Sequence, residues 1–184
     1  MVAADQNTSN LILVSGPSRG GKSRWAEHLL SGSADVTYVA TAPDRPDDRD
    51  WQTRLDLHRR RRPSHWRLLE SDADLTTALR TIPQQSSVLI DALGGFVACH
   101  LDASDQAWSA CCEELVEQLA GMGQTCVVVI EETGWGVVPP TRIGGRFRDR
   151  LGSLAQILDR QADSAWLVLQ GRAIDLHALS QRVP

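Results

Sequence analysis

The sequence has almost no lysine and no apolar run long enough to cross a membrane. Lys22 is the single lysine among 19 basic residues, so arginine carries nearly all of the positive charge. A membrane-spanning helix needs roughly 20 consecutive apolar residues, and no stretch of this chain approaches that length. The polar segment 1–10 also lacks the basic-then-apolar pattern of an export signal. We therefore expect a cytoplasmic protein without a membrane span.

The cysteine spacing and the charge balance argue against further classes. The four cysteines, Cys99, Cys111, Cys112 and Cys126, contain no Cys-x-x-Cys pair. This spacing does not suit a zinc site, and we expect reduced thiols in a protein core. A net charge of −4 argues against a general nucleic-acid binder, although residues 59–62 form a local block of four arginines. The content of 42% hydrophobic and 23% charged residues excludes disordered and collagen-like chains.

Short apolar runs alternate with helical patterns along the chain. This alternation is typical of βαβ units, in which a mostly parallel sheet is covered by helices on both faces. The sequence therefore predicts an α/β fold whose functional loops lie at the carboxyl ends of the strands. We expect strands over 11–14, 36–40, 66–70, 88–91, 125–130, 166–169 and 174–176, helices over 22–30, 51–61, 74–82, 107–121 and 142–163, and loops over 41–50 and 131–140.

Residues 16–23 match the phosphate-loop pattern G-x-x-x-x-G-K-S, between an expected strand and an expected helix. Glycines let several backbone N–H groups turn inward around an anion, and the helix N-terminus adds a positive dipole end. We expect Lys22 to reach the β- and γ-phosphates and Ser23 to ligate Mg²⁺. The strand–loop–helix setting favours phosphate binding over a chance match in a glycine-rich turn. The predicted phosphate ligands are Gly16, Pro17, Ser18, Arg19, Gly20, Gly21, Lys22 and Ser23.

A carboxylate directly follows the apolar run 88–90. Nucleotide sites of this type need a carboxylate on the metal side, at the end of another core strand. Asp91 fits that place and is predicted as a second Mg²⁺ ligand. The alternative is an aspartate that ends the strand or caps a helix.

The segment 54–66 combines two histidines with a block of arginines. On a helix, His58 lies near Arg54, Arg61 and Arg62, because residues three and four apart are neighbours. Surrounding cations disfavour a protonated imidazole, so His58 is expected to be a neutral nucleophile. The same arginines could hold a polyphosphate. The alternative is an ordinary histidine on a solvated basic helix face.

These motifs, taken in order, resemble the bifunctional adenosylcobinamide kinase / adenosylcobinamide-phosphate guanylyltransferase family of cobalamin biosynthesis. The resemblance extends from residue 11 to about residue 171. The phosphate loop alone is shared by many nucleotide-binding proteins, whereas the His-to-Trp block and the Gly-Val-Val-Pro block are more specific together. The blocks are 16–27, 38–42, 54–58, 62–66, 132–139, 146–149 and 166–168.

The resemblance implies two reactions on a three-layer, RecA-like P-loop fold. A nucleoside triphosphate, ATP or GTP, phosphorylates a hydroxyl of adenosylcobinamide. GTP then guanylylates that phosphate through GMP bound covalently to a histidine, which by its position in the motif is His58 rather than His65. The family also implies Mg²⁺, a corrinoid substrate and a homotrimer. We accordingly expect a flexible segment over 1–10 and a single P-loop catalytic domain over 11–184.

The resemblance also implies nucleotide contacts outside the phosphate loop. Glu70 is the weakest of them, since a solvated acid at a strand end is as good an explanation. Glu132 could polarise the substrate hydroxyl or order its loop, and Arg146 and Arg148 could contact phosphate or form surface salt bridges. The implied contacts are Ala40, Thr41, Ala42, Arg62, Pro63, Ser64, His65 and Glu70.

The chain departs from the common family pattern at several positions. Asn is usual where Glu131 stands, a hydroxylated residue is common at Gly94, and a Gly-Arg-x-Asn-Gln block is usual over 152–156, where this chain has Ser153 and Ala155. These departures concern corrinoid recognition or the kinase step, and one alternative follows from them: a guanylyltransferase without kinase activity. The other functions considered are a P-loop regulatory protein and a small-molecule kinase of another pathway, neither of which would use His58.

Overall fold

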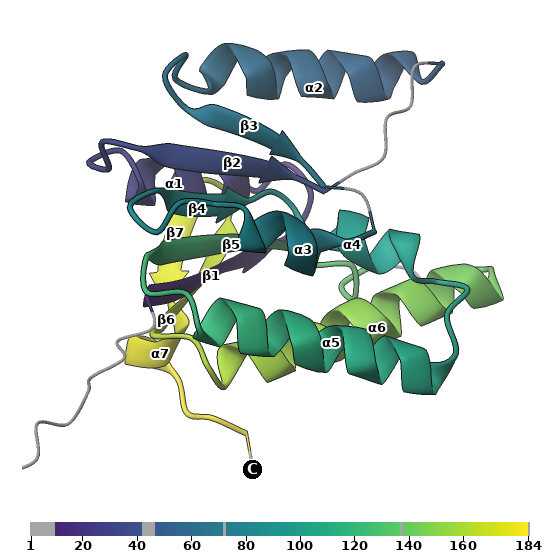
Figure 1. Cartoon of the computed structure of the whole chain (residues 1–184). Coiled ribbons are helices and arrows are strands. Elements are labelled where there is room, and N and C mark those ends of the chain that lie inside the picture. Colours follow the sequence, from purple (N-terminus) through teal and green to yellow (C-terminus); the bar gives the residue numbers. More distant parts are fainter. Residues whose placement is uncertain (1–9, 42–46, 72, 137, 184) are drawn as a thin grey trace, which may run out of the picture.

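The computed structural model describes residues 10–41, 47–71, 73–136 and 138–183, without the side chains of six residues between 50 and 58, His58 among them. Within these residues seven strands form one sheet in the order β3-β2-β4-β5-β1-β6-β7 (Figure 1). Neighbouring strands are parallel except for β7, which pairs antiparallel with β6. The strands are β1 (Asn10–Gly16), β2 (Val36–Ala40), β3 (Arg67–Glu70), β4 (Ser87–Ile90), β5 (Thr125–Glu131), β6 (Ser164–Leu169) and β7 (Arg172–Asp175).

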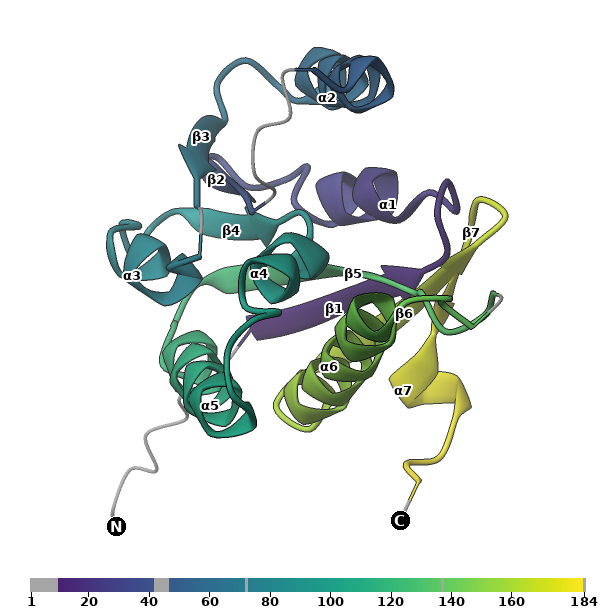
Figure 2. The same cartoon turned by 90° about the vertical axis from the view of Figure 1, so that its right-hand side faces the viewer.

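Helices cover both faces of the sheet, which gives the predicted three-layer α/β architecture. Figure 2 shows α3, α4, α5 and α6 on one face and α1 on the other, with α2 at the outer side of β3. The helices are α1 (Lys22–Leu29), α2 (Arg49–Arg61), α3 (Leu75–Arg80), α4 (Leu93–Cys99), α5 (Asp105–Ala120), α6 (Arg142–Asp159) and the short α7 (Leu176–Leu179).

The central strand β5 shows why the apolar runs are uninterrupted. Successive side chains of a strand point to opposite faces. Cys126 and Val128 therefore pack into the larger core cluster with α4, α5 and α6, whereas Val127 and Val129 pack into the smaller cluster on the α1 side. A strand buried on both faces has no polar side to alternate with, as expected for a parallel sheet.

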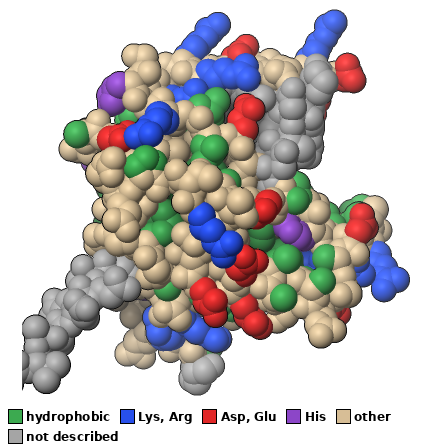
Figure 3. Space-filling model, in the orientation of Figure 1, with side chains coloured by type: hydrophobic (Ala, Val, Ile, Leu, Met, Phe, Trp, Pro, Cys, Tyr) green, Lys and Arg blue, Asp and Glu red, His purple; other side chains and the backbone are tan. Residues whose placement is uncertain are grey.

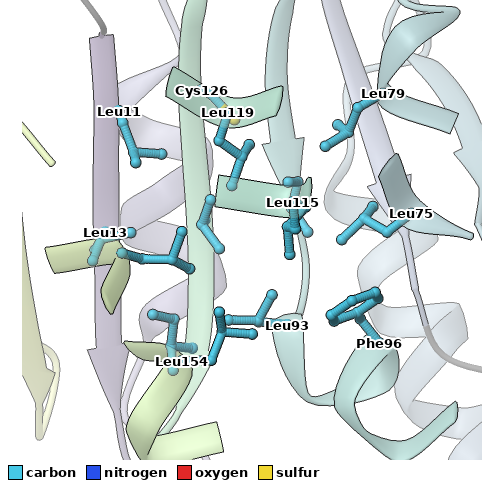
Figure 4. Close-up of a cluster of buried hydrophobic side chains, with 14 of the residues drawn as sticks. Leu11, Leu13, Leu75, Leu79, Leu93, Phe96, Leu115, Leu119, Cys126 and Leu154 are labelled. Atoms are coloured by element: carbon cyan, nitrogen blue, oxygen red, sulfur yellow. The ribbon is translucent and has the colours of Figure 1, made fainter. Parts of the chain in front are cut away.

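The larger cluster lies between the sheet and helices α3 to α6, and Figure 4 shows its leucines pointing into this layer. On α5, Trp108, Cys112, Leu115 and Leu119 form one buried stripe. Full burial of one leucine side chain contributes about 1.5–3 kcal/mol to folding. This layer therefore holds α5 and α6 firmly under the strands that carry the functional loops.

Several expected elements have different bounds, and α4 was not expected at all. Gly94 and Gly95 lie inside α4, and two glycines lower the helix propensity of a seven-residue segment. Helix α2 begins two residues earlier than predicted, and α6 ends at Asp159 rather than at residue 163. The start of α6 at Arg142 is as predicted, because the Thr141 side chain accepts a hydrogen bond from the Gly144 amide at 3.1 Å and caps the helix.

None of the four cysteines forms a disulfide, and they are not all in the core. Cys112 and Cys126 are buried as expected, and burial raises their thiol pKa values to about 11 and about 12. Cys99 on α4 is exposed, so the expectation of a core thiol was wrong there. Of the helices in the described ranges, none combines the length and apolar character needed to span a bilayer.

Candidate nucleotide-binding and catalytic site

The phosphate loop connects the end of β1 to the start of α1 and packs closely on β6. Gly16 has φ +147° and Gly21 has φ +111°, which are left-handed conformations that favour glycine. A Cβ atom at Gly16 would lie 2.2 Å from the Val168 carbonyl oxygen, and one at Gly20 would lie 2.7 Å from the same atom. The glycines therefore let the loop lie against the backbone of β6, and they fix where the loop stands over the sheet.

Lys22 is folded back over this loop. Its side chain is buried, and Nζ donates a hydrogen bond to the Pro17 carbonyl oxygen at 2.9 Å. The Gly171 amide donates to the Gly20 carbonyl oxygen at 2.9 Å, which ties the loop to the β6–β7 turn. The first turn of α1 contains no acidic residue, and among the described residues no side chain caps it. Its leading N–H groups are therefore directed at the loop, where an anion would lie.

Asp91 lies directly after β4, as predicted, and it is joined to the basic segment through Tyr38. The Tyr38 hydroxyl donates to Asp91 Oδ2 at 2.9 Å. The Arg62 guanidinium carbon lies over the Tyr38 ring, 5.2 Å from its centroid. Burial and the neighbouring Asp91 carboxylate together raise the pKa of Tyr38 far above its ordinary value, so the phenol stays a donor. Through these two contacts of Tyr38, Arg62 is linked to Asp91 at the end of β4.

A second carboxylate, Glu131, ends β5 beside the phosphate loop. Glu131 pairs in register with Gly16, and its Oε2 accepts a hydrogen bond from the Gly94 amide at 2.9 Å. Burial raises the pKa of Glu131 and Asp91 raises it further, whereas the hydrogen bond from the Gly94 amide and the Lys22 ammonium lower it. Glu131 thus interacts electrostatically with both Asp91 and Lys22. The sequence indicated Glu131 only as a departure from a pattern, although its place at the end of a buried strand could have pointed to it.

The remaining predicted contacts are spread over the strand ends near β2 and β3. The Thr41 side chain is buried and donates to the Ala92 carbonyl oxygen, and the Ser71 amide donates to the Ala40 carbonyl oxygen at 2.8 Å. Ala42 lies outside the described residues. Glu70 is exposed at the end of β3. Ala40 and Thr41 therefore lie at the same strand ends as Asp91, whereas Glu70 lies at the surface.

The helix predicted to carry the nucleophile is α2. His58 belongs to this helix, but its side chain lies outside the description. Figures 1 and 2 place α2 at the outer side of β3 rather than against the phosphate loop, and Figure 3 shows basic side chains at the top of the molecule, where α2 lies. Arg61 at the end of α2 donates to Glu27 Oε1 of α1 at 2.9 Å. After it, Pro63 is half-buried, whereas Ser64 and His65 are exposed.

Arg146 and Arg148 on α6 both make contacts within the chain. Arg146 donates to the Leu101 carbonyl oxygen at 2.8 Å, which links α6 to the α4–α5 connection. Arg148 donates twice to Asp149 Oδ1, at 2.9 and 2.8 Å. For Arg148 the salt-bridge alternative therefore describes the structure. Arg146 instead donates to a backbone oxygen, and a contact of either arginine with phosphate stays a prediction.

A cavity of about 460 Å³ lies between the end of β5 and helix α6. Its lining includes Glu131, Glu132, Arg148, Ser153 and Ala155. The Glu132 amide donates to the Gly16 carbonyl oxygen at 2.8 Å, so the cavity begins where the phosphate loop begins. Three of the departures from the common family pattern line this cavity, and the fourth, Gly94, holds Glu131 through its amide.

The residues present suit a magnesium ion shared with a nucleotide better than one held by protein alone. Mg²⁺ is typically bound through one or two protein oxygens together with phosphate oxygens. Ser23 on the first turn of α1 and Asp91 after β4 supply such oxygens near Lys22. Among the described side chains, no group of three or more His, Cys, Asp or Glu residues is arranged to hold a metal. The donor set therefore fits a cation that arrives with a triphosphate.

The parallel sheet, the glycine loop and the buried lysine define a P-loop protein of the RecA-like fold. Comparison with solved structures agrees at the level of fold. A type III secretion ATPase matches with a TM-score of 0.54 at 14% identity, over 86% of this chain and 51% of that one. A protein from Pyrococcus horikoshii OT3 matches with a TM-score of 0.53 at 8% identity, over 91% of this chain and 85% of that one.

The sequence comparisons identify the family. The model of the CobU family, described as cobinamide kinase / cobinamide phosphate guanyltransferase, matches residues 12–176. The bifunctional adenosylcobalamin biosynthesis proteins CobU of Escherichia coli and of Salmonella typhimurium are each 32% identical over 90% of this chain and 99% of theirs. CobP of Pseudomonas aeruginosa is 34% identical over 89% of this chain and 95% of its own. The chain belongs to this cobinamide kinase / cobinamide phosphate guanyltransferase family.

Proposed function

We propose that the protein phosphorylates a hydroxyl of adenosylcobinamide with ATP or GTP, and then transfers GMP from GTP to that phosphate. The products of the second reaction are adenosylcobinamide-GDP and pyrophosphate. The observation that carries this proposal is the buried Lys22 in a strand–loop–helix phosphate site, on a chain that matches the family model over residues 12–176. Both reactions need a triphosphate held at one place, and this loop is built for that task.

In the kinase step the substrate hydroxyl oxygen attacks the γ-phosphorus. The bond from the γ-phosphorus to the bridging oxygen breaks, the nucleoside diphosphate leaves, and a carboxylate at the strand edge accepts the hydroxyl proton. Lys22 and the N-terminus of α1 balance the negative charge that develops on the phosphate oxygens. Ser23 and Asp91 would hold Mg²⁺, which neutralises phosphate charge when bound. The loop from Gly16 to Ser23 would cradle the phosphates.

In the guanylyl step an imidazole nitrogen of His58 attacks the α-phosphorus of GTP, and pyrophosphate leaves. An oxygen of the corrinoid phosphate then attacks the same phosphorus, and the phosphorus–nitrogen bond breaks to regenerate the histidine. Splitting the transfer into two displacements makes each of them easier. The contact from Arg61 to Glu27 supports this role, because it joins the helix that carries His58 to the helix that begins at Lys22.

Further parts of the proposal concern binding and assembly. Ala40, Thr41 and Ala42, together with the segment 62–65 and Glu70, would contact the nucleotide as the family resemblance implies. Residues 11–184 would act as one catalytic domain in the cytoplasm. Three copies of the 20.2 kDa chain would form a homotrimer. Sedimentation equilibrium tests the assembly, and a mass of one or two chains contradicts the homotrimer.

Labelled GTP tests the proposed chemistry. The wild-type protein is incubated with GTP labelled at the α-phosphate or at the γ-phosphate. The protein is then separated from free nucleotide under alkaline denaturing conditions and checked for label. We expect an acid-labile adduct from the α-label only, which His58→Ala abolishes and His65→Ala retains. Unchanged guanylyl transfer in His58→Ala contradicts the assignment of the nucleophile.

A guanylyltransferase without kinase activity is the second candidate, because the departures at Glu131, Gly94, Ser153 and Ala155 come together at one place beside the phosphate loop. Transfer of the γ-label to adenosylcobinamide distinguishes the two candidates. Transfer supports the bifunctional enzyme. Absence of this transfer, with the α-label adduct still formed, supports the guanylyltransferase alone. Tight reversible GTP binding without either transfer favours a regulatory protein.

A further inference from the structure

The cavity between β5 and α6 is lined by no residue of the phosphate loop, yet it adjoins that loop. Glu131 and Glu132, which line it, follow the strand that pairs with β1, and the Glu132 amide is bonded to Gly16, the first residue of the phosphate loop. A molecule in this cavity would therefore lie next to the start of the phosphate loop, on the α6 side of the sheet. Its volume of about 460 Å³ is that of a small-molecule pocket.

The charges that line the cavity favour a neutral ligand over a phosphate. Glu131, Glu132 and Asp149 contribute three carboxyl groups to the lining. The one guanidinium of the lining, Arg148, donates both of its short hydrogen bonds to the adjacent Asp149. Its charge is therefore already balanced, and the glutamates would repel a phosphate dianion. Carboxyl oxygens accept hydrogen bonds from hydroxyl and amide groups, which an uncharged alcohol supplies.

The shape of the surroundings suits a ligand with a large apolar body. Small residues of α6, Gly152 and Ser153, leave the α6 side of the cavity open. The adjoining loop and the first turn of α6 expose Trp135, Val138 and Ile143, with 57%, 71% and 50% of each residue accessible. Trp135 directly follows Gly134 of the lining, and exposed apolar side chains that gather at a surface are typical of binding sites. An arm of the ligand could enter the cavity while its body covers these side chains.

We propose that this cavity binds the alcohol acceptor of the phosphoryl-transfer step, with the hydroxyl-bearing arm between Glu131 and Glu132 and the ring system over the exposed apolar side chains. This assignment rests on the proposed function, and it names where the second substrate of that function binds. It also places the alcohol and the triphosphate on two sides of the end of β1. The two substrates would then be next to each other at Gly16.

Two glycines of α6 provide a matched pair of variants. Gly152 lines the cavity and Gly145 does not, and in both cases an added Cβ meets nothing within 4 Å. Leucine has a higher helix propensity than glycine, so neither substitution should prevent folding. Gly152→Leu fills the cavity mouth, and Gly145→Leu makes the same change elsewhere on the helix. Ser153→Leu is a second variant that fills the cavity.

Equilibrium dialysis with adenosylcobinamide, without nucleotide and followed by the absorbance of the corrinoid, tests the assignment. We expect Gly152→Leu and Ser153→Leu to raise the Kd at least tenfold and Gly145→Leu to change it less than twofold. The loss should be larger for the alcohol than for its phosphate. Equal Kd values in all variants, an equal loss in Gly145→Leu, no binding by the wild-type protein, or a larger loss for the phosphate overturns the proposal.

Adduct formation from α-labelled GTP is measured on the same proteins and does not involve the acceptor. Absence of the adduct in the wild-type protein counts against the proposed function, and the dialysis result still decides whether the cavity binds the alcohol. A normal adduct with unchanged dialysis in the cavity variants overturns the cavity assignment alone. The two failures are therefore distinguishable.

Discussion

At the scale of single residues, the position of the phosphate loop depends on two glycines that have no Cβ atom. Gly16 and Gly20 lack the Cβ atoms that would meet the Val168 carbonyl oxygen. Lys22 is buried where its compact ammonium can fold over the loop, and the planar, broader guanidinium of arginine would not fit there in the same way. This explains why a chain with 18 arginines has its one lysine at this position.

The substitution Gly16→Ala should destabilise the fold. The new Cβ atom would lie 2.2 Å from a backbone oxygen, at a φ of +147° that L-residues rarely adopt. We expect the free energy of unfolding to fall by about 2–4 kcal/mol, measured by guanidinium denaturation. Gly32→Ala is the control, because its Cβ would meet nothing within 4 Å. Equal stabilities of the two variants would show that the loop can shift away from β6.

The substitution Glu131→Gln should change how stability depends on pH. Burial raises the pKa of this carboxyl in the folded state, so above about pH 4.5 the folded protein binds more protons than the unfolded chain. The stability contributed by this group is therefore present at low pH and is lost as pH rises through the folded pKa. We expect the stability of Glu131→Gln relative to wild type to increase with pH across this window, measured by urea unfolding at several pH values. The opposite slope contradicts a raised pKa.

At the scale of secondary-structure elements, the site depends on how neighbouring elements are tied together. Helix α4 comes close to β5 because Gly94 has no side chain; a Cβ there would lie 2.7 Å from a carboxyl oxygen of Glu131. The Gly94 amide then bonds that carboxylate. Helix α2, in contrast, is joined to α1 through the Arg61 to Glu27 ion pair, which is an interaction of partly exposed side chains.

The substitution Arg61→Ala should affect the guanylyl step more than the stability. Partly exposed ion pairs contribute less than about 1 kcal/mol, so the unfolding free energy should change little. Loss of the tie between α1 and α2 should slow adduct formation from α-labelled GTP by about tenfold, since small misplacements of a nucleophile are costly. Arg59→Ala is the matched control, because Arg59 pairs with Asp56 inside the same helix. Equal rates in the two variants would contradict a positioning role for Arg61.

At the scale of the whole molecule, the site assembles from strands that are distant in sequence. The ends of β1, β4 and β5 bring Lys22, Asp91 and Glu131 together, because adjacent parallel strands end at the same edge of the sheet. The order of the strands therefore decides which carboxylates surround the phosphate loop. The same edge borders the cavity under α6, so two binding regions share one strand end.

Nucleotide binding should stabilise the whole fold through the same loop. GTP at about one hundred times its Kd is expected to add about 2.7 kcal/mol to the unfolding free energy, because it binds only the folded protein. For a chain of this size that corresponds to a rise in Tm of roughly 5–10 °C, measured by calorimetry. Lys22→Ala should lose most of this rise, whereas Arg160→Ala, at an exposed position after α6, should retain it. A full rise in Lys22→Ala contradicts triphosphate binding at this loop.

Local patterns in the sequence predicted most of the fold. The apolar runs that became β1, β2 and β5 were found because both faces of these strands are buried, which leaves an unbroken apolar signal. Helix α4 was missed because Gly94 and Gly95, required by close neighbours, remove the helical signal. The exposure of Cys99 could not be read from residue type, since it follows from which side of α4 meets the sheet.

The candidate site was predicted in parts. The phosphate loop and the position of Asp91 followed from their places after apolar runs. The link from Arg62 through Tyr38 to Asp91 did not, because the three residues come from separate segments and meet only across the sheet. For the same reason the closeness of Glu131, Gly94, Ser153 and Ala155 could not be predicted, because they are far apart along the chain and the structure places them around one cavity.

The sequence by itself determined the chemistry of the phosphate loop and the α/β pattern, since both depend on residues close together in the chain. Local hydrogen bonding and apolar periodicity involve residues a few positions apart, so both can be recognised in the sequence alone. The tertiary structure decided which carboxylates lie beside Lys22, and that a cavity opens next to them. These features depend on strand order and on the approach of distant backbones, where a single missing Cβ atom, as at Gly94, determines what can fit.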